Sequence, residues 1–469
     1  MTRPLASTST STSTPQWTAR KLALHTLLDV ERRSSFADEA FDAFSSKARL
    51  SPDDQALAFE LVYGVLRHRS TLDWRLNGVM TRPLHRFPLN IITILRMGAY
   101  QLLKLDRIPE PAAVNESVNL AKTLKGRDLS GLVNGVLRAL IRQPAPPWPK
   151  VVDDPVHALS IHHSMPTWLT TRWIDRLGLR NAEEACRRTV SIPPLTLRTN
   201  TLQCTREQLQ ERLFELGHTV TRTPVSPVGL TITKCGPLSS LEPLQEGWCY
   251  IEDEAAQLVP LLMDVRPGQR ILDACAAPGG KATHLAALMN NQGQVWAVDQ
   301  NPIRLKRLEQ NAQRLGISII TPVQATINSS FPSLDDLSSW CREGFDRILV
   351  DAPCSGLGVL RRHPEAKWQK TADRFEQHHQ EQLGMLNRVC ILLRPGGVLV
   401  YSACSTEPEE STQVISQFCH DHPDFLHESS TSWIPTPGQS LVDSTGDVST
   451  MASGYDMDGF FSARLKLPT

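Results

Sequence analysis

The segment QRILDACAAPGGKATH, residues 269–284, decides the fold of this chain. Ile271 and Leu272 belong to an apolar run typical of a buried strand, and the glycines at 279 and 280 mark the turn into a helix. A helix that begins here presents unpaired backbone amides to a carboxylate or a phosphate, and the glycines let a ligand approach the backbone. The segment therefore predicts a ligand-binding strand–turn–helix unit.

Strand and helix patterns alternate around and after this segment. They are QRILDAC (269–275), QVWAVDQ (294–300), NPIRLKRLEQNAQRLG (301–316), RILVDAP (347–353), EQLGMLNRVCILL (381–393), GGVLVYSAC (396–404) and FFSARLKL (460–467). Alternation of buried strands with helices indicates a mostly parallel, doubly wound sheet. We therefore predict an α/β Rossmann-like domain over residues 246–469.

The preceding part of the chain has a different pattern. Residues 16–142 carry apolar residues at three- and four-residue steps, as in ARKLALHTLLDVE (19–31), and predict an all-α bundle. Residues 143–160, which include QPAPPWPKVVDDP, are expected to form a proline-rich linker. Residues 161–245 contain strand, helix and strand patterns and predict a small α+β subdomain. The Ser/Thr-rich residues 1–15 are expected to be a disordered tail, so the chain is predicted to be multidomain.

The composition is that of an ordinary soluble globular protein, with 41% hydrophobic and 21% charged residues. The ten cysteines show no Cys-x-x-Cys spacing, which disfavours a zinc knuckle and a disulfide framework and favours reduced thiols in a cytosol. No apolar run reaches the length needed to cross a membrane. Because 49 basic residues balance 49 acidic ones, any nucleic-acid binding must come from local patches. We expect a cytoplasmic monomer without a metal.

The ligand of the glycine-rich turn can be narrowed by spacing. Neither the dinucleotide pattern Gly-x-Gly-x-x-Gly nor the triphosphate pattern Gly-x-x-x-x-Gly-Lys-Ser/Thr occurs in it. Asp299 ends the next strand, at a position suited to accept hydrogen bonds from ribose hydroxyls. A glycine turn with a ribose-binding acid and no pyrophosphate pattern favours S-adenosylmethionine. For Asp299 alone, a helix N-cap before Pro302 is an equally good interpretation.

Two cysteines point to the chemistry. Cys354 in RILVDAPCSGLG and Cys404 in GGVLVYSACSTEPEE each follow an apolar strand-like run, where α/β sheets place ligand sites. Methylation at carbon 5 of cytosine requires a thiolate that first adds to carbon 6, so a cysteine is needed for that reaction. Either cysteine alone is better interpreted as a small buried hydrophobic residue. The pair at two strand ends favours methyl transfer to a pyrimidine.

Asp351, just before Pro353, is the third candidate catalytic residue. A carboxyl group there can bond the exocyclic amine and ring nitrogen 3 of a cytosine and stabilise the charge that develops on thiolate addition. Methyltransferases that act on amino groups typically carry Asn/Asp-Pro-Pro-aromatic at this place and need no cysteine. The alternative for Asp351 is a strand-end cap.

Two basic clusters are candidate RNA contacts. Arg361, Arg362, His363 and Lys367, with Trp368 among them, are expected to clamp phosphates while the indole stacks on a base. Arg67, His68 and Arg69 form a weaker candidate, for which a solvated helix face is as good an interpretation. Single-stranded or loop RNA is favoured because the target base must leave its stack to meet a thiolate.

Long motifs carry a resemblance to a known family. DACAAPGGKATH (273–284), VDAPCSGLGVLRRHPEAKW (350–368), LRPGGVLVYSACSTEPEE (393–410) and DGFFSARL (458–465) resemble the motif series of RNA 5-methylcytosine methyltransferases of the NOL1/NOP2/Sun family. LRMGAYQLLKLDRIPEPAAVNESVNLAK (95–122) and SGLVNGVLRAL (130–140) are similar to the NusB antitermination-factor domain, a helical RNA-binding domain.

The resemblance implies roles for individual residues. Cys404 would be the nucleophile, Cys354 would assist release of the methylated RNA, and Asp351 would contact both cofactor and cytosine. The implied S-adenosylmethionine site comprises Cys275, Ala276, Ala277, Pro278, Gly279, Gly280, Lys281, Asp299, Thr326 and Asp351. The implied substrate is a cytosine of small-subunit (16S) ribosomal RNA, with another RNA such as tRNA as the alternative.

Three positions depart from the family pattern. Thr326 stands where the cofactor site usually has an acidic residue, Ala403 replaces the threonine before the nucleophilic cysteine, and Glu252 replaces a usual glutamine. None of these changes removes a group that the chemistry requires.

Two other classes of function remain open. A non-catalytic RNA-binding or assembly factor would keep the NusB-like part but would not need both cysteines. A Rossmann oxidoreductase would share the sheet and the ribose-binding acid but would need the missing pyrophosphate pattern. Binding of S-adenosylmethionine without binding of NAD would separate these alternatives.

Overall fold

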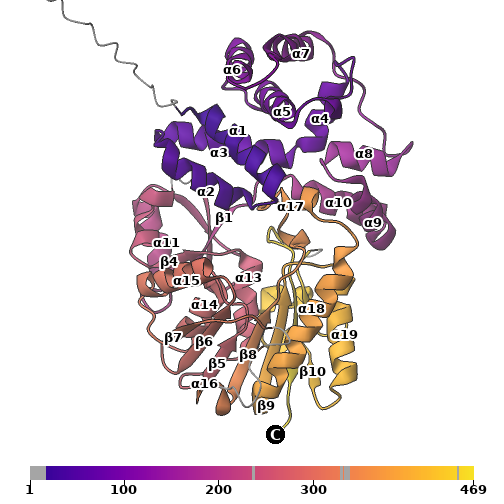
Figure 1. Ribbon diagram of the computed structural model, residues 1–469. Helices are drawn as coiled ribbons and strands as arrows, with labels where there is room; N and C mark the ends of the chain where they lie inside the picture. Colours follow the sequence, from indigo (N-terminus) through magenta and orange to yellow (C-terminus); the bar gives the residue numbers. More distant parts are fainter. Residues whose placement is uncertain (1–16, 235–237, 328–330, 332–338, 452–453) are drawn as a thin grey trace, which may run out of the picture. The chain divides into compact units, whose positions relative to one another are not determined.

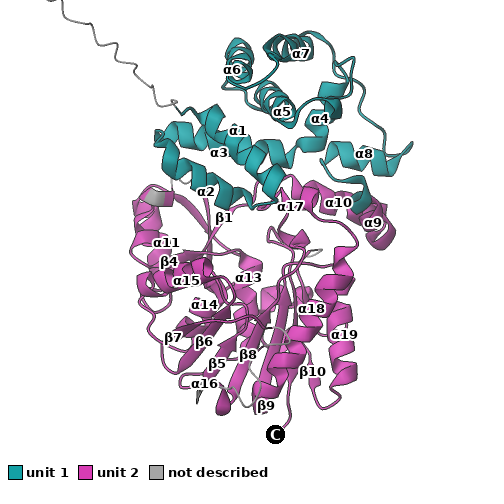
Figure 2. Ribbon diagram, viewed as in Figure 1, with its two compact units in different colours: residues 1–170 teal, residues 171–469 magenta. Residues whose placement is uncertain are grey.

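The computed structural model describes residues 17–234, 238–327, 331, 339–451 and 454–469 (Figure 1). The predicted disordered tail, residues 1–15, and Cys235 lie outside the described residues. The chain divides into two compact units, residues 1–170 and residues 171–469 (Figure 2).

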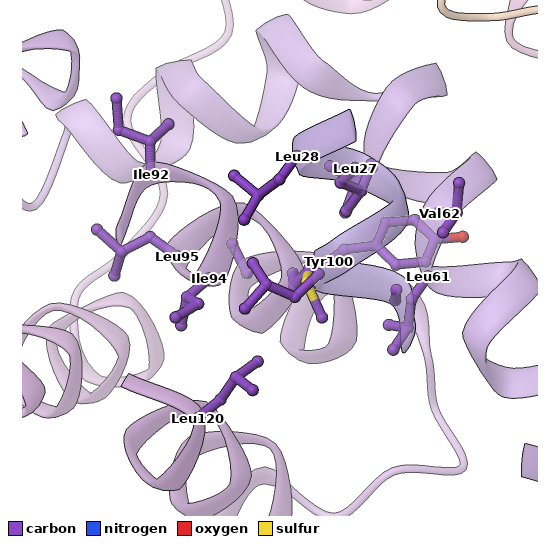
Figure 3. Packing of buried hydrophobic residues seen from close by; sticks show 14 of the residues in the cluster. Leu27, Leu28, Leu61, Val62, Ile92, Ile94, Leu95, Tyr100 and Leu120 are labelled. Atoms are coloured by element: carbon purple, nitrogen blue, oxygen red, sulfur yellow. The ribbon is translucent and has the colours of Figure 1, made fainter. Parts of the chain in front are cut away.

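The first unit is helical, as predicted for residues 16–142. Its α-helices are α1 (Ala19–Arg33), α2 (Ala37–Ala48), α3 (Pro52–Arg67), α4 (Arg69–Asn77), α5 (Leu89–Lys104), α6 (Glu110–Lys122), α7 (Ser130–Arg142) and α8 (Pro155–His162). Thr18 and Ser51 cap α1 and α3 by accepting bonds from backbone amides in the first turns. Leu61, Ile94 and Leu95 lie fully buried in the shared core (Figure 3).

A glycine allows the core helices to approach closely. A side chain at Gly98 of α5 would meet the side chain of Leu137 of α7 at 2.6 Å. The predicted linker also packs on this unit, because Trp148 contacts Trp74 with ring centroids 4.6 Å apart. Just after the linker, the Thr71 hydroxyl donates to the Ile161 carbonyl at 2.6 Å. Residues 143–160 thus include a tryptophan that packs on α4 and the first residues of α8.

The second unit contains a small antiparallel sheet and a large mixed sheet. The small sheet has the order β2-β3-β1-β4 and comprises β1 (Leu195–Thr199), β2 (Thr219–Arg222), β3 (Gly229–Lys234) and β4 (Cys249–Ile251). Its helices and those before it are α9 (Thr167–Leu177), α10 (Leu179–Thr189), α11 (Arg206–Glu215) and α12 (Glu242–Gln245). The predicted α+β subdomain has this sheet, although β4 lies beyond residue 245.

The large sheet has the order β10-β12-β9-β8-β5-β6-β7, with β11 paired to β12. Its strands are β5 (Arg270–Asp273), β6 (Gln294–Asp299), β7 (Ile320–Gln324), β8 (Phe345–Asp351), β9 (Leu393–Ala403), β10 (Leu426–Glu428), β11 (Val448–Ser449) and β12 (Phe461–Lys466). The five strands from β9 to β7 are parallel, whereas β12 pairs antiparallel with β9 on one side and with β10 on the other. The prediction of a mostly parallel sheet is confirmed; β7, β10 and β11 were not predicted.

Helices cover both faces of this sheet (Figure 1). The helices of this region are α13 (Glu254–Leu258), α14 (Gly280–Leu288), α15 (Pro302–Arg314), α16 (Ser339–Arg342), α17 (Ala366–Gln369), α18 (Arg374–Val389) and α19 (Thr412–Asp421). Successive strand residues point to opposite faces. Ile271 packs in a core with α14 and α15, and Leu272 packs in a core with α18 and α19. The carboxyl ends of the parallel strands meet at one edge, which is where such sheets bind ligands.

Candidate active site

The loop between β5 and α14 is held in place by backbone bonds to β6. The Ala276 amide donates to the Val298 carbonyl at 2.9 Å, and the Ala277 amide donates to the Asp299 carboxylate at 3.3 Å. Gly279 has a φ of 106°, a left-handed conformation that favours glycine. The predicted strand–turn–helix unit is therefore present, with the amide ends of α14 at the sheet edge.

A buried arginine from the small sheet forms hydrogen bonds with the first residues of α14, where this loop ends. Arg198 of β1 donates to the Glu252 carboxylate at 2.7 Å, to the Gly280 carbonyl at 2.5 Å and to the Thr283 hydroxyl at 2.9 Å. A side chain at Gly280 would meet the Glu252 carboxylate at 2.6 Å. Glu252 is thus accommodated as the ion-pair partner of Arg198. Sequence analysis missed Arg198, because nothing near it in the chain identifies its partner.

Asp273, at the end of β5, is a site residue that sequence analysis also missed. Its side chain is fully buried, and neither carboxylate oxygen has a hydrogen-bond partner among the described residues. Burial and the negative charge of Asp351 raise the pKa of Asp273 to about 7. Such a group is suited to accept hydrogen bonds from a ligand that enters the strand-end edge.

Asp299 lies at the end of β6, as predicted. One of its carboxylate oxygens accepts from the Ala277 amide and the other from the Asn301 amide at 2.8 Å. The N-cap of α15 is Asn301, which accepts from the Ile303 and Arg304 amides, so the capping interpretation of Asp299 is wrong. Thr326 follows β7, the neighbouring strand, and is exposed.

Lys281 and Asp351 form an ion pair at the centre of the edge. The Lys281 ammonium lies 2.7 Å from the Asp351 carboxylate and 5.0 Å from the centroid of the Phe460 ring. Burial lowers the pKa of Lys281, but the charge and hydrogen bond of Asp351 raise it by more, so the net shift is upward. Lys281 is therefore a fixed positive charge beside the strand ends.

The two predicted cysteines lie together. The sulfur atoms of Cys354 and Cys404 are 3.2 Å apart, after β8 and β9 respectively. The hydrogen bond from Cys354 lowers the pKa of Cys404, and this effect and the charge of Lys281 outweigh the opposing effects of burial and nearby carboxylates. The same bond and burial raise the pKa of Cys354 well above its ordinary value. Cys404 is therefore the more acidic thiol of the pair.

Glycines bring a third segment against the cysteine loops. The Gly358 amide donates to the Cys404 carbonyl at 3.0 Å, and the Gly459 amide donates to the Gly358 carbonyl at 2.8 Å. A side chain at Gly358 would meet the Gly459 carbonyl oxygen at 1.8 Å. Backbone hydrogen bonds and close packing at Gly358 therefore hold three segments together: the loop after Cys354, the loop after Cys404 and the segment before β12.

The first predicted RNA clamp is largely engaged in internal ion pairs. Arg361 is 5% exposed and donates to Asp458 at 2.7 Å, and Arg362 donates to Asp458 and Asp253 at 2.6 Å each. Lys367 is fully buried. The side chains of Arg361 and Lys367 are thus buried inside the domain, and their contact with RNA stays a prediction.

The two rings of that clamp are partly exposed. The His363 ring lies 3.5 Å from the Glu365 carboxylate, and Trp368 is half-buried with the Lys367 ammonium 5.4 Å from its ring centroid. His363 and Trp368 remain predicted RNA contacts.

The second basic cluster is also internally paired. Arg67 is buried, and Arg69 makes two bonds to Glu31 at 3.0 and 2.9 Å. His68 stacks on Tyr100 with ring centroids 6.0 Å apart. Arg67 is therefore not placed on an open surface, and this cluster stays the weaker candidate for RNA contact.

Within the part of the chain that the structure describes, no group of three or more His, Cys, Asp or Glu side chains is arranged to hold a metal ion. None of the helices in these ranges is long and apolar enough to cross a membrane.

Three family models match the chain. Residues 260–466 match the model described as 16S rRNA methyltransferase RsmB/F. Residues 18–142 match the NusB family, and residues 165–239 match a ferredoxin-like domain of RsmF/B-like methyltransferases. Each match falls within one of the three folded parts of the chain, namely the helical bundle, the small subdomain and the α/β domain.

Curated relatives match over nearly the whole chain. A probable ribosomal RNA small subunit methyltransferase B of Synechocystis is 36% identical, covering 96% of this chain and 99% of the relative. One of Bacillus subtilis is 33% identical over 95% of this chain and 98% of the relative.

Solved structures share the fold. The crystal structure of PH0851 has a TM-score of 0.76 at 22% identity, covering 95% of this chain and 98% of that one. A methyltransferase homologue from Pyrococcus horikoshii has a TM-score of 0.55 at 26% identity, covering 67% of this chain and 99% of that one.

Proposed function

The chain belongs to the 16S rRNA methyltransferase RsmB/F family, and from this premise we propose that it methylates carbon 5 of a cytosine in small-subunit ribosomal RNA. The single observation that supports this reaction best is the pair of thiols, 3.2 Å apart, at the ends of two adjacent parallel strands. A methyltransferase that acts on an amino group has no use for such a pair.

The residues at the strand ends fit S-adenosylmethionine. The carboxylate oxygens of Asp273 have no hydrogen-bond partner among the described residues, and Asp299 lies at the adjacent strand end. Asp299 would hold the ribose, and the backbone amides of residues 275–281 would hold the remainder with Asp273. When bound, the cofactor supplies an electrophilic methyl group on a sulfonium.

Cys404 would start the reaction. Its thiolate adds to carbon 6 of the cytosine, which makes carbon 5 nucleophilic toward the methyl group. The Cys354 hydrogen bond and the Lys281 charge both favour the thiolate of Cys404. The lowered pKa of Cys404 and the raised pKa of Cys354 therefore favour Cys404 as the attacking group.

Asp351 would hold the base. Its carboxylate is suited to accept a hydrogen bond from the exocyclic amine of cytosine, as the charge on the ring changes during thiolate addition. The ion pair with Lys281 at 2.7 Å fixes the position of this carboxylate. Asp351 would thus orient the base over the two thiols.

Release completes the cycle. A base removes the proton from carbon 5, the bond between carbon 6 and sulfur breaks, and its electron pair returns to Cys404 as thiolate. Cys354 lies next to the departing sulfur and would donate its S–H to it. This contact gives Cys354 a role in release without making it a nucleophile.

Bisulfite sequencing of RNA from cells with and without this chain tests the proposal. We expect one 16S cytosine to lose its protection when the chain is absent or carries Cys404→Ala. If a tRNA cytosine loses its protection instead, the substrate is tRNA and not 16S ribosomal RNA. Unchanged RNA methylation, or binding of NAD in place of S-adenosylmethionine by calorimetry, would overturn the proposed reaction.

A further inference from the structure

A buried carboxylate lies behind the two thiols. Glu410 is fully buried, and one of its carboxylate oxygens interacts with the Ser355 amide and the His378 Nδ1, each at 2.6 Å. The other oxygen accepts from the hydroxyls of Ser355 and Ser405. A single side chain therefore has four polar partners from three different segments of the chain.

The two serines directly follow the two cysteines. Ser355 comes after Cys354 and Ser405 after Cys404, and the two hydroxyl oxygens are 3.3 Å apart. We propose that Glu410 is a positioning residue that ties the two cysteine loops together and so keeps the Cys354 and Cys404 sulfur atoms within hydrogen-bond distance of one another. This inference rests on the proposed function, in which Cys404 is the nucleophile.

The energetics support a dedicated role for this charge. A buried carboxylate without partners is costly, and an apolar side chain would fill the same volume at lower cost. Burial alone raises the pKa of Glu410, but the bonds with His378, Ser355 and Ser405 lower it by more. The carboxylate is therefore held ionised, as an acceptor for both loops.

The segment that carries Glu410 is itself anchored. The Tyr401 hydroxyl of β9 donates to the Glu410 carbonyl at 2.7 Å, and the His379 ring of α18 bonds the Glu409 carbonyl at 2.8 Å. The carboxylate is thus fixed to β9 and α18 before it contacts the loops. A rigid anchor is what a positioning residue requires.

The sign of the effect on Cys404 distinguishes positioning from simple electrostatics. The negative charge of Glu410 raises the pKa of Cys404, but by less than the Cys354 bond lowers it. Glu410→Gln removes the negative charge and replaces one of the two acceptor oxygens with an amide NH2 donor. If Glu410 acts by holding the loops, the pKa of Cys404 rises in this variant; if it acts only by its charge, the pKa falls.

Thiol alkylation of the full chain measures this shift without RNA or cofactor. The rate of iodoacetamide modification of Cys404 is followed against pH by peptide mass spectrometry for the wild type, Glu410→Gln and Glu409→Gln. The control changes a neighbouring, partly exposed carboxylate that pairs with Arg172. A rise of one pKa unit lowers the thiolate fraction at neutral pH about tenfold, so we expect slower alkylation for Glu410→Gln and an unchanged profile for the control.

Oxidative cross-linking measures the proximity of the thiols directly. Diamide removes two electrons and two protons from the Cys354–Cys404 pair, which forms a disulfide while diamide becomes the hydrazine. Glu410→Gln should slow this cross-link about tenfold, because bond formation needs the sulfurs to close to about 2.05 Å. In a protein that already carries Cys354→Ala, adding Glu410→Gln should not raise the pKa of Cys404 further.

The outcomes are separable. An unchanged or faster alkylation and an unchanged cross-linking rate in folded Glu410→Gln would overturn the positioning role, as would additive effects of Glu410→Gln and Cys354→Ala. If Glu410→Gln fails to fold by circular dichroism, Ser355→Ala replaces it, with a smaller change in the same direction. Failure of the wild type to methylate RNA would instead refute the proposed function and leave these thiol results intact.

Discussion

Replacing Cys354 with alanine gives the sharpest test of how the thiols share the reaction. The change removes the thiol whose sulfur lies 3.2 Å from the Cys404 sulfur, and its hydrogen bond is the largest single influence lowering the pKa of Cys404. A hydrogen bond to a charged group contributes about 1.5–3 kcal/mol. Its loss corresponds to a pKa rise of about one to two units for the Cys404 thiol.

This shift affects attack and release unequally. A thiolate of higher pKa is scarcer at neutral pH but more nucleophilic, with a Brønsted coefficient of about 0.4–0.5, so attack slows less than the thiolate fraction falls. Release requires Cys404 to leave as a thiolate, and a poorer leaving group leaves more slowly. Cys354→Ala should therefore still attack and should accumulate the covalent protein–RNA adduct.

Denaturing gel electrophoresis with 16S RNA and S-adenosylmethionine measures the adduct. We expect a shifted protein–RNA band for Cys354→Ala, little for the wild type, and none for Cys404→Ala or for the double variant, which serves as the matched control. A band that persists only in Cys404→Ala would reverse the roles assigned to the two cysteines and refute the reasoning.

Three further predictions address the cofactor edge and the loops. Asp299→Ala should weaken S-adenosylmethionine binding by about 1–3 kcal/mol in calorimetry, and an unchanged affinity would remove Asp299 from the site. Gly358→Ala should lower the melting temperature and methylation together, because its side chain would lie 1.8 Å from the Gly459 carbonyl oxygen; a fully active, equally stable variant would contradict this packing. Asp273 has a pKa of about 7 in the folded chain against 3.8 ordinarily, so it binds its proton more tightly when folded. Stability of the cofactor-free chain should accordingly fall as pH rises from about 4 to 7, and denaturant titrations of Asp273→Asn should lack that fall.

The positions of the strand ends could be predicted because short local sequence patterns mark them. An apolar run followed by an acid or a cysteine placed Asp299, Asp351, Cys354 and Cys404 on one edge, and the parallel sheet brings them there. The strand β7, ITPVQ, was missed because its proline and threonine interrupt the apolar run.

The ion pairs and hydrogen bonds of the site could not be predicted, because they join residues that lie far apart in the sequence. Arg361 looked like a surface cation, but its partner Asp458 lies 97 positions away in the chain. The roles of Arg198 and Glu410 were not apparent either, because Glu252 lies 54 positions from Arg198, and Ser355 and His378 lie 55 and 32 positions from Glu410. Hydrophobic periodicity predicts which residues are buried and whether a segment is a helix or a strand. It does not predict which charged residues form ion pairs with one another.

The arginine beneath the cofactor loop bears on how this protein can be divided. Because Arg198 of the small sheet holds both Glu252 and the start of α14, the α/β region is not a self-sufficient module. A chain cut at residue 246 would keep the glutamate and lose the guanidinium that neutralises it. Gene fusions or truncations that separate the two parts should therefore survive only when both members of this pair change together, so the small sheet and the catalytic region are expected to be inherited as one unit.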